Sequence, residues 1–201
     1  RKEAKQRMKE AANRGDKEVQ ALFNARQLAL KISANSVYGF TGTGDRGMMP
    51  CLAIAETTTS QGRKLIEQTS IFTENTLGYP VIYGDTDSVF VDCAQLVVPN
   101  DAEATMKNVF EFGERAEKAL NDYFREMHCA KTGLDDTTIK IEFEKAYWPY
   151  LILKKKRYVG RKIEPGSDWK LDYKGIEVAR RDVCPFATCV MKGILEKTIM
   201  E

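Results

Sequence analysis

Two carboxylates, Asp85 and Asp87, stand one residue apart in the stretch VIYGDTDSVF of residues 81–90. No Lys or Arg occurs within ten residues of this pair on either side. A carboxylate beside an apolar core is costly unless an opposite charge or a metal ion pairs with it. A hard divalent cation such as Mg²⁺ suits one or two carboxylates together with substrate phosphates. The pair therefore predicts a metal site that faces a phosphorylated substrate.

Two other interpretations of the same stretch exist. The short polar side chains of Asp-Thr-Asp-Ser also suit a tight turn in which each one bonds its own backbone. A calcium loop that began at Asp85 would need Gly at its sixth position and Glu at its twelfth. Phe90 and Leu96 occupy those positions, which excludes the calcium loop but leaves the turn as an alternative.

A second group of candidate residues lies in the segment KISANSVYG. Lys31, Asn35 and Tyr38 occur at positions i, i+4 and i+7, on one stripe of a helix. Lysine offers a point charge to phosphate, and the phenol ring offers a packing face to a flat base. Arg1 and Lys5, also four residues apart, add two cations on the preceding helix. The alternative is a polar stripe that faces solvent.

The elements that must position these residues follow from periodicity and turn signals. Asp85 and Asp87 are expected at a hairpin tip, where side chains two residues apart point the same way. Helices and strand pairs in the observed order predict an α+β fold. Predicted helices cover residues 1–12, 17–38, 52–75, 102–127 and a segment from about Pro185 onward. Predicted strands cover residues 81–83, 88–92, 138–143, 150–153, 157–163 and 169–173.

Composition excludes several classes of protein. No run of eighteen apolar residues exists, so no membrane helix is expected. The five cysteines form no CxxC pair, so no zinc ribbon is expected. Scattered free thiols fit a reducing compartment. Residues 1–31 contain nine Lys or Arg and four acids, residues 151–181 contain ten and four, and residues 92–145 contain seven and twelve. Two basic blocks around an acidic middle indicate a polyanionic partner, with ordinary solvated faces as the alternative.

Three motifs occur in a telling order: KISANSVYG, then YGDTDS, then KKKRY. Together they resemble the family B DNA polymerases. The residues within the motifs are most similar to those of the delta subgroup, cellular or viral. The resemblance runs over essentially the whole chain. It implies part of a right-hand polymerase, with fingers helices in residues 1–40 and the second part of the palm in residues 41–160. The end of the palm and the start of the thumb would follow in residues 161–201.

The resemblance implies template-directed DNA synthesis, in which two Mg²⁺ ions assist nucleotidyl transfer from a dNTP to a primer 3′-hydroxyl. Asp87 would be the surest metal ligand, Asp85 its acidic neighbour, and Glu144 an acidic palm residue near the metal site. The triphosphate would be gripped by Lys31, Arg1 and Lys5. The pocket for the nascent base pair would be lined by Asn35 and Tyr38.

The resemblance also gives a use to the second basic block, as a hold on the primer–template duplex. On a strand, alternate residues share a face, so Lys156 and Tyr158 are expected to face DNA while Lys155 and Arg157 face elsewhere. The track would continue toward the thumb. The expected DNA-binding residues are Lys155, Lys156, Arg157, Tyr158, Lys174, Arg180 and Arg181.

The sequence departs from the family in lacking an upstream palm aspartate of the form D-x-x-S-L-Y-P-S. A fragment that is inactive by itself is therefore expected, from a parent that acts in the nucleus or is encoded by a virus and acts in the infected host cell. A sliding clamp and accessory subunits would bind through other parts of the parent. Two rival functions stay open: a non-catalytic nucleic-acid-binding fragment, or another two-carboxylate polymerase such as a reverse transcriptase.

Overall fold

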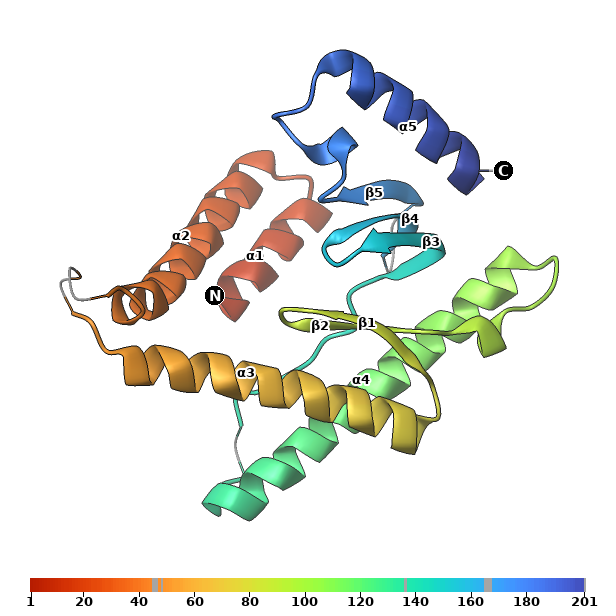
Figure 1. The fold of residues 1–201 in the computed structure, drawn as a ribbon. Coiled ribbons are helices and arrows are strands. Elements are labelled where there is room, and N and C mark those ends of the chain that lie inside the picture. Colours follow the sequence, from red (N-terminus) through yellow and green to blue (C-terminus); the bar gives the residue numbers. More distant parts are fainter. Residues whose placement is uncertain (45–46, 48, 136, 165–167, 201) are drawn as a thin grey trace. The chain divides into compact units, whose positions relative to one another are not determined.

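The computed structural model describes residues 1–44, 47, 49–135, 137–164 and 168–200 (Figure 1). It divides into two compact units, Arg1–Leu65 and Ile66–Glu201, whose boundary falls inside helix α3 (Leu52–Phe72). The expected boundaries after residues 40 and 160 stay predictions. Strand β4 (Arg157–Ile163) includes residue 160. Each unit is described by itself.

The first unit is built on a helical hairpin. Helix α1 (Lys2–Asn13) and helix α2 (Lys17–Thr41) pack side by side, as Figure 1 shows, and both confirm the predicted helices. Gly15 turns the chain with a φ of +74°, a conformation that glycine adopts without a steric cost. The Asp16 side chain then caps α2 by accepting a hydrogen bond from the Val19 N–H at 3.1 Å. Small residues allow the close packing, since Ala4 and Ala11 are buried.

The second unit contains two small antiparallel sheets. Strands β1 (Val81–Asp85) and β2 (Ser88–Val91) form a hairpin, and strands β3 (Ala146–Lys154), β4 and β5 (Lys170–Lys174) form a sheet in that order. Helix α3 ends in a π-helical turn, Thr73–Leu77, before β1. Short 3₁₀ turns lie at Ala94–Leu96 (η2) and Glu177–Ala179 (η3). Helices together with antiparallel sheets confirm the α+β prediction.

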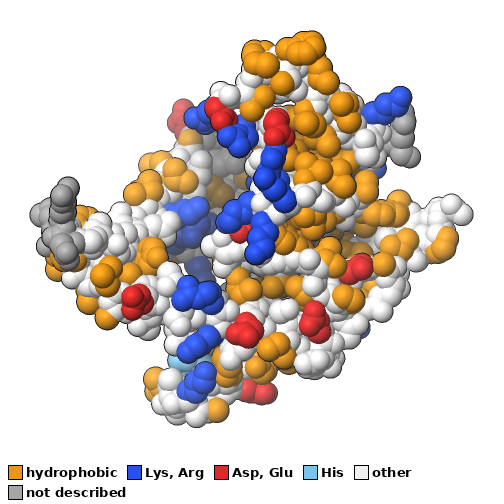
Figure 2. All heavy atoms as spheres, in the orientation of Figure 1, with side chains coloured by type: hydrophobic (Ala, Val, Ile, Leu, Met, Phe, Trp, Pro, Cys, Tyr) orange, Lys and Arg blue, Asp and Glu red, His pale blue; other side chains and the backbone are white. Residues whose placement is uncertain are grey.

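Two helices supply the apolar cover of this unit. On one side of the three-stranded sheet, Val159 and Ile176 pack with Leu195 and Ile199 of helix α5 (Pro185–Met200). Helix α4 (Ala102–Thr132) contributes Met106 and Val109 to a second cluster that includes Ala146 of β3. Figure 2 shows further apolar side chains at the surface around α5, where Phe186, Val190 and Ile194 are exposed. In the described residues, no helix has the length and apolar character that a bilayer crossing requires.

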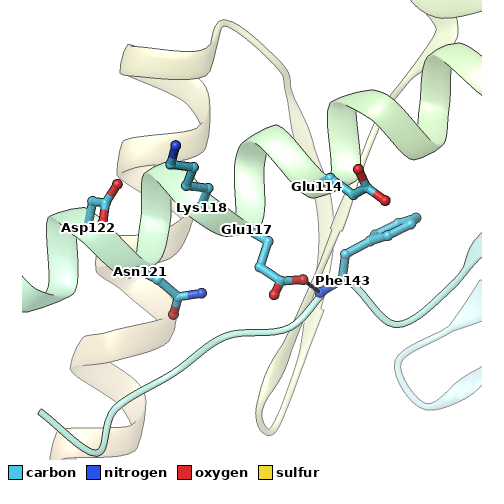
Figure 3. A pocket seen from close by; sticks show the side chains of 6 residues that line it. All are labelled: Glu114, Glu117, Lys118, Asn121, Asp122 and Phe143. Atoms are coloured by element: carbon cyan, nitrogen blue, oxygen red, sulfur yellow. Dashed lines mark hydrogen bonds between the residues drawn. The ribbon is translucent and has the colours of Figure 1, made fainter.

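The strand predicted at residues 138–143 is wrong. This segment is extended but pairs with no strand among the described residues, and it runs instead along α4 (Figure 3). The Asn121 side chain donates to Ile141 O at 2.9 Å and accepts from Ile141 N at 3.0 Å. The Glu117 carboxylate accepts from Phe143 N at 2.8 Å. Helix side chains therefore satisfy backbone groups that a neighbouring strand would otherwise pair with.

Replacement of Asn121 by alanine is expected to destabilise the second unit. Both backbone groups of Ile141 lose their partner, and unpaired polar groups that are partly buried cost about 1–3 kcal/mol. Urea denaturation of the variant measures the loss. The matched control is Lys118→Ala, one turn earlier on α4 and exposed, which should leave the free energy of unfolding nearly unchanged. Equal stability of both variants would show that α4 does not hold the segment through Asn121.

Candidate active site

The β1–β2 hairpin presents its two carboxylates at its tip. Asp85 pairs with Ser88 across the ladder, so that Thr86 and Asp87 alone form the turn. The backbone N–H of Asp87 donates to Asp85 O at 2.6 Å, and the Ser88 hydroxyl donates to the same oxygen at 3.1 Å. Thr86 has a φ of +53°, which is rare for a β-branched residue. Backbone strain of this kind persists only where its surroundings fix it, and it gathers at functional sites.

Asp85 has a cationic partner that is far away in the sequence. The Lys156 ammonium lies 2.7 Å from Asp85 Oδ1 and also donates to Thr86 Oγ1 at 3.2 Å. The Thr86 hydroxyl in turn donates to Asp85 Oδ1 at 3.0 Å. The hydrogen bond from Lys156 lowers the pKa of Asp85 despite partial desolvation, and the same bond raises the pKa of Lys156. The tip thus combines the turn chemistry of the alternative interpretation with an ion pair.

The turn that carries Lys156 joins β3 to β4 and is fixed to the hairpin through Tyr83. The Lys156 backbone N–H donates to the Tyr83 hydroxyl at 2.7 Å. Lys156 itself has a φ of +63°, in the left-handed region. Sequence reasoning missed Tyr83, although its position two residues before Asp85 places both side chains on one face of β1. Alternation along the strand therefore indicated that Tyr83 shares a face with Asp85. Only the fold brings the Tyr83 hydroxyl to the Lys156 N–H.

A layer of aromatic rings lies between the hairpin and the three-stranded sheet. Phe90 stacks on Tyr150 with ring centroids 5.3 Å apart and an interplanar angle of 8°. Gly160 on β4 makes room, because a Cβ there would stand 2.6 Å from Tyr147 Cδ1. Burial, followed by the hydrogen bond to Asp172, raises the pKa of Tyr147. The layer, which fixes the two turns relative to one another, consists of Tyr83, Phe90, Tyr147, Tyr150 and Tyr158.

This layer corrects the expectation that Tyr158 faces outward with Lys156. The Tyr158 residue is only 8% exposed, and its ring makes an edge contact with Phe90 at 5.5 Å. Lys156 stands in a turn rather than in a strand, so the rule of alternate faces does not apply to it. Its side chain is 70% exposed. The two residues therefore have different environments, one in the layer and one at the surface.

Glu144 is exposed and has a lysine as its partner. Its side chain is 76% exposed and pairs with Lys145 at 3.5 Å. Within the described part of the chain, no group of three or more His, Cys, Asp or Glu residues gathers as a metal site. The hairpin tip supplies two carboxylates, and Mg²⁺ fits such a donor set when substrate oxygens and water complete its shell.

The comparisons with known proteins place the three motifs in a family. The sequence model of DNA polymerase family B matches residues 1–201. The chain belongs to this family. It is 41% identical over 190 residues to the DNA polymerase delta catalytic subunit of Schizosaccharomyces pombe, which covers 90% of this chain and 16% of that protein. The family predicted from the motifs is therefore confirmed.

Two further relatives widen the range of organisms. The chain is 40% identical over 213 residues to the DNA polymerase delta catalytic subunit of Caenorhabditis elegans, across 100% of the chain and 18% of that protein. It is 37% identical over 203 residues to a DNA polymerase of Paramecium bursaria Chlorella virus NY2A, across 100% of the chain and 21% of that protein. The chain spans between 16% and 21% of the length of these three relatives.

In this family B chain the expected DNA-binding residues fall into two groups. Some are tied to acidic neighbours: Arg157 pairs with Glu177, Lys174 lies 3.5 Å from Asp172, and Arg180 lies 2.5 Å from Asp182. Hydrogen bonding from Arg180 lowers the pKa of Asp182 to about 2. Lys156 pairs in the same way with Asp85. The second group, Lys155 and Arg181, is exposed.

The nucleotide-binding candidates of the family B chain all belong to the first unit and are exposed there. Lys31, Asn35 and Tyr38 follow one another along α2, as their spacing predicts. Lys5 lies one turn beyond Arg1 on α1, where its N–H donates to Arg1 O at 3.0 Å. Because this unit is described by itself, their approach to a nucleotide stays a prediction.

Proposed function

We propose that this chain contributes the Asp85–Asp87 hairpin, together with nucleotide- and duplex-binding residues, to the active site of a DNA-directed DNA polymerase. One observation carries the proposal. In a chain of DNA polymerase family B, the turn of YGDTDS and the turn of KKKRY meet, with the Lys156 ammonium 2.7 Å from Asp85 Oδ1. This contact supports the proposal because it brings a lysine of the expected DNA-binding segment to a carboxylate of the expected metal site.

In the proposed reaction, Asp87 and Asp85 would hold Mg²⁺, with Glu144 nearby. When bound, the ions would neutralise charge at the attacking 3′-hydroxyl and at the leaving pyrophosphate. The chain itself positions the reactants, which accounts for much of the catalysis in phosphoryl transfer. Because Lys156 already neutralises Asp85, Asp87 is assigned the larger share of metal binding.

The remaining site residues position substrate. Lys31, with Arg1 and Lys5, binds the triphosphate as point charges. Asn35 and Tyr38 border the nascent base pair. The phosphate backbone of the primer–template is bound by Lys155 and Lys156, and the track is extended by Arg157, Lys174, Arg180 and Arg181. Tyr158 supports the track from within the aromatic layer and does not contact DNA. Contacts of this kind hold a duplex without reading its sequence, which a replicative enzyme needs.

The relatives support a cellular setting for the proposed function. We assign the chain to fingers, palm and the start of the thumb of a longer polymerase that acts in DNA replication. Its partners are primer–template DNA and dNTP, with a sliding clamp and accessory subunits bound through other parts. Action in the nucleus, or in an infected host cell, agrees with relatives from eukaryotes and from a virus. The family B match sets aside a reverse transcriptase.

A Lys31→Ala variant of the full-length polymerase tests the nucleotide assignment. The KM for dNTP should rise roughly tenfold to a hundredfold, because a hydrogen bond to a charged group is worth about 1.5–3 kcal/mol. Steady-state primer extension at varied dNTP concentration gives this value. The matched control is Lys17→Ala, which removes an exposed lysine from the first turn of the same helix. A KM that is unchanged in both variants would remove Lys31 from the nucleotide site.

A further inference from the structure

The backbone of Lys156 has one close neighbour at its N–H and another at its carbonyl. The Tyr83 hydroxyl accepts from the Lys156 N–H at 2.7 Å. Gly175, the residue directly after β5, lies beside the Lys156 carbonyl and has a φ of +63°. A Cβ built on Gly175 would stand 2.1 Å from Lys156 O and 3.2 Å from Lys156 C. Only a residue without a side chain permits this approach, because the obstructing atoms belong to the backbone.

The segment after β5 is fastened to the turn at further points. Tyr158 pairs with Lys174 in the β4–β5 ladder, which brings the two chain segments together. One residue beyond Lys156, the Arg157 guanidinium pairs with Glu177 of η3. The close approach of Gly175 to Lys156 is therefore flanked by a strand pairing and an ion pair that fix both chain segments. A side chain there could not be accommodated by movement of a loose loop, so the turn itself would have to shift.

We propose that Gly175 is a positioning residue: its missing side chain sets the backbone of Lys156 and thereby the ammonium at the tip that carries Asp85 and Asp87. Gly175 acts through Lys156 and touches no substrate. The inference rests on the proposed function, in which Lys156 binds the primer–template. A left-handed φ at Lys156 requires support from its surroundings. Tyr83 supplies it at the N–H of Lys156, and Gly175 supplies it at the carbonyl.

The first test is Gly175→Ala in the full-length polymerase. The logarithm of duplex affinity depends on the logarithm of salt concentration with a slope set by the phosphate contacts, and loss of one lysine contact should reduce this slope by about one. Gly175→Ala should reduce it as much as Lys156→Ala does. If the Lys156 ammonium is misplaced by about 1 Å, kcat/KM for primer extension should also fall by roughly a hundredfold. If Gly175→Ala kept the wild-type slope while Lys156→Ala reduced it, the inference about Gly175 would be overturned and the proposed function would stand.

Gly133→Ala is the matched control for backbone strain. Gly133 caps α4 with a φ of +70°, and nothing lies within 4 Å of a Cβ built there. Alanine at this position meets a similar left-handed strain but no obstructing backbone. This variant should melt at a lower temperature than the wild type while keeping the wild-type salt slope. An equal change of slope in Gly133→Ala would assign the Gly175 effect to general destabilisation.

A double-mutant cycle shows whether Gly175 acts through Lys156. Once Lys156 is alanine, Gly175→Ala should cause little further loss of duplex affinity, since no ammonium remains to be misplaced. Fully additive losses would contradict the inference while leaving the proposed function intact. If Lys156→Ala alone changed neither affinity nor slope, both the inference and the assignment of Lys156 to DNA would fail.

Tyr83→Phe covers the case in which Gly175→Ala does not fold. It removes the hydroxyl that accepts from Lys156 N and adds no volume. The variant should show the same loss of salt slope, and the loss should vanish in the Lys156→Ala background. A wild-type slope in Tyr83→Phe would show that the ammonium is placed without support of its turn, which overturns the inference.

Discussion

Primer extension is expected to be lost when Asp87 is replaced by alanine in the full-length polymerase. Asp87 lies in the two-residue turn of the hairpin, and Asp85 beside it is already paired with Lys156. Removal of the main carboxylate should cost several kcal/mol of transition-state stabilisation, which corresponds to roughly a thousandfold or more in kcat. Single-turnover extension of a labelled primer at saturating dNTP and Mg²⁺ measures the effect.

Duplex affinity provides the contrast for the Asp87 variant. Binding depends on the cationic residues rather than on Asp87, so the dissociation constant for primer–template should stay close to that of the wild type. Asp135→Ala is the matched control, since it removes one exposed carboxylate elsewhere in the same unit and should extend primers normally. Full activity of Asp87→Ala would move the chemistry away from this hairpin.

The second large effect is expected at Gly160, beneath the aromatic layer. A Cβ there would lie 2.6 Å from Tyr147 Cδ1, 3.1 Å from Tyr150 Cδ2 and 3.2 Å from Pro149 O. Gly160→Val adds three carbons to this packed position, and overpacking of this kind costs about 3 kcal/mol. Thermal and urea denaturation should both show the loss, and extension should fall as the hairpin and the β3–β4 turn separate.

The control for Gly160→Val is Gly193→Val in α5. Nothing lies within 4 Å of a Cβ built on Gly193, and valine is no worse than glycine inside a helix. This variant should therefore unfold close to the wild-type midpoint. If both variants had the same stability, the close approach of the tyrosine rings to β4 would not be a feature of the folded protein.

Local signals in the sequence identified most of the elements. Asp16 and Gly15 mark the start of α2 and the turn before it, and both act as their residue types predict. The α4 prediction ended at residue 127, whereas the helix continues to Thr132, where Gly133 caps it. Apolar residues at helical spacing thus find an element well, but its end depends on the capping residue.

Longer-range features of the candidate site were not accessible from the sequence. The partner of Asp85 is Lys156, 70 residues beyond Thr86, and no local pattern connects them. The apolar alternation of residues 138–143 indicated a strand, but Asn121 of α4 satisfies the backbone of this segment instead. Tyr158 was assigned to the surface because alternation gives two faces without saying which is covered. In all three cases, contacts between segments distant in the sequence determine where the residue lies.

The structure of the full-length polymerase with primer–template, a matched dNTP and Mg²⁺ tests the central claim most directly. We predict an Asp87 carboxylate oxygen about 2.1 Å from a Mg²⁺ ion that also binds the triphosphate. We also predict the Lys156 ammonium beside the duplex. A ternary complex in which Mg²⁺ and the primer 3′-hydroxyl meet away from the Asp85–Asp87 hairpin would contradict the assignment of this turn as the catalytic centre.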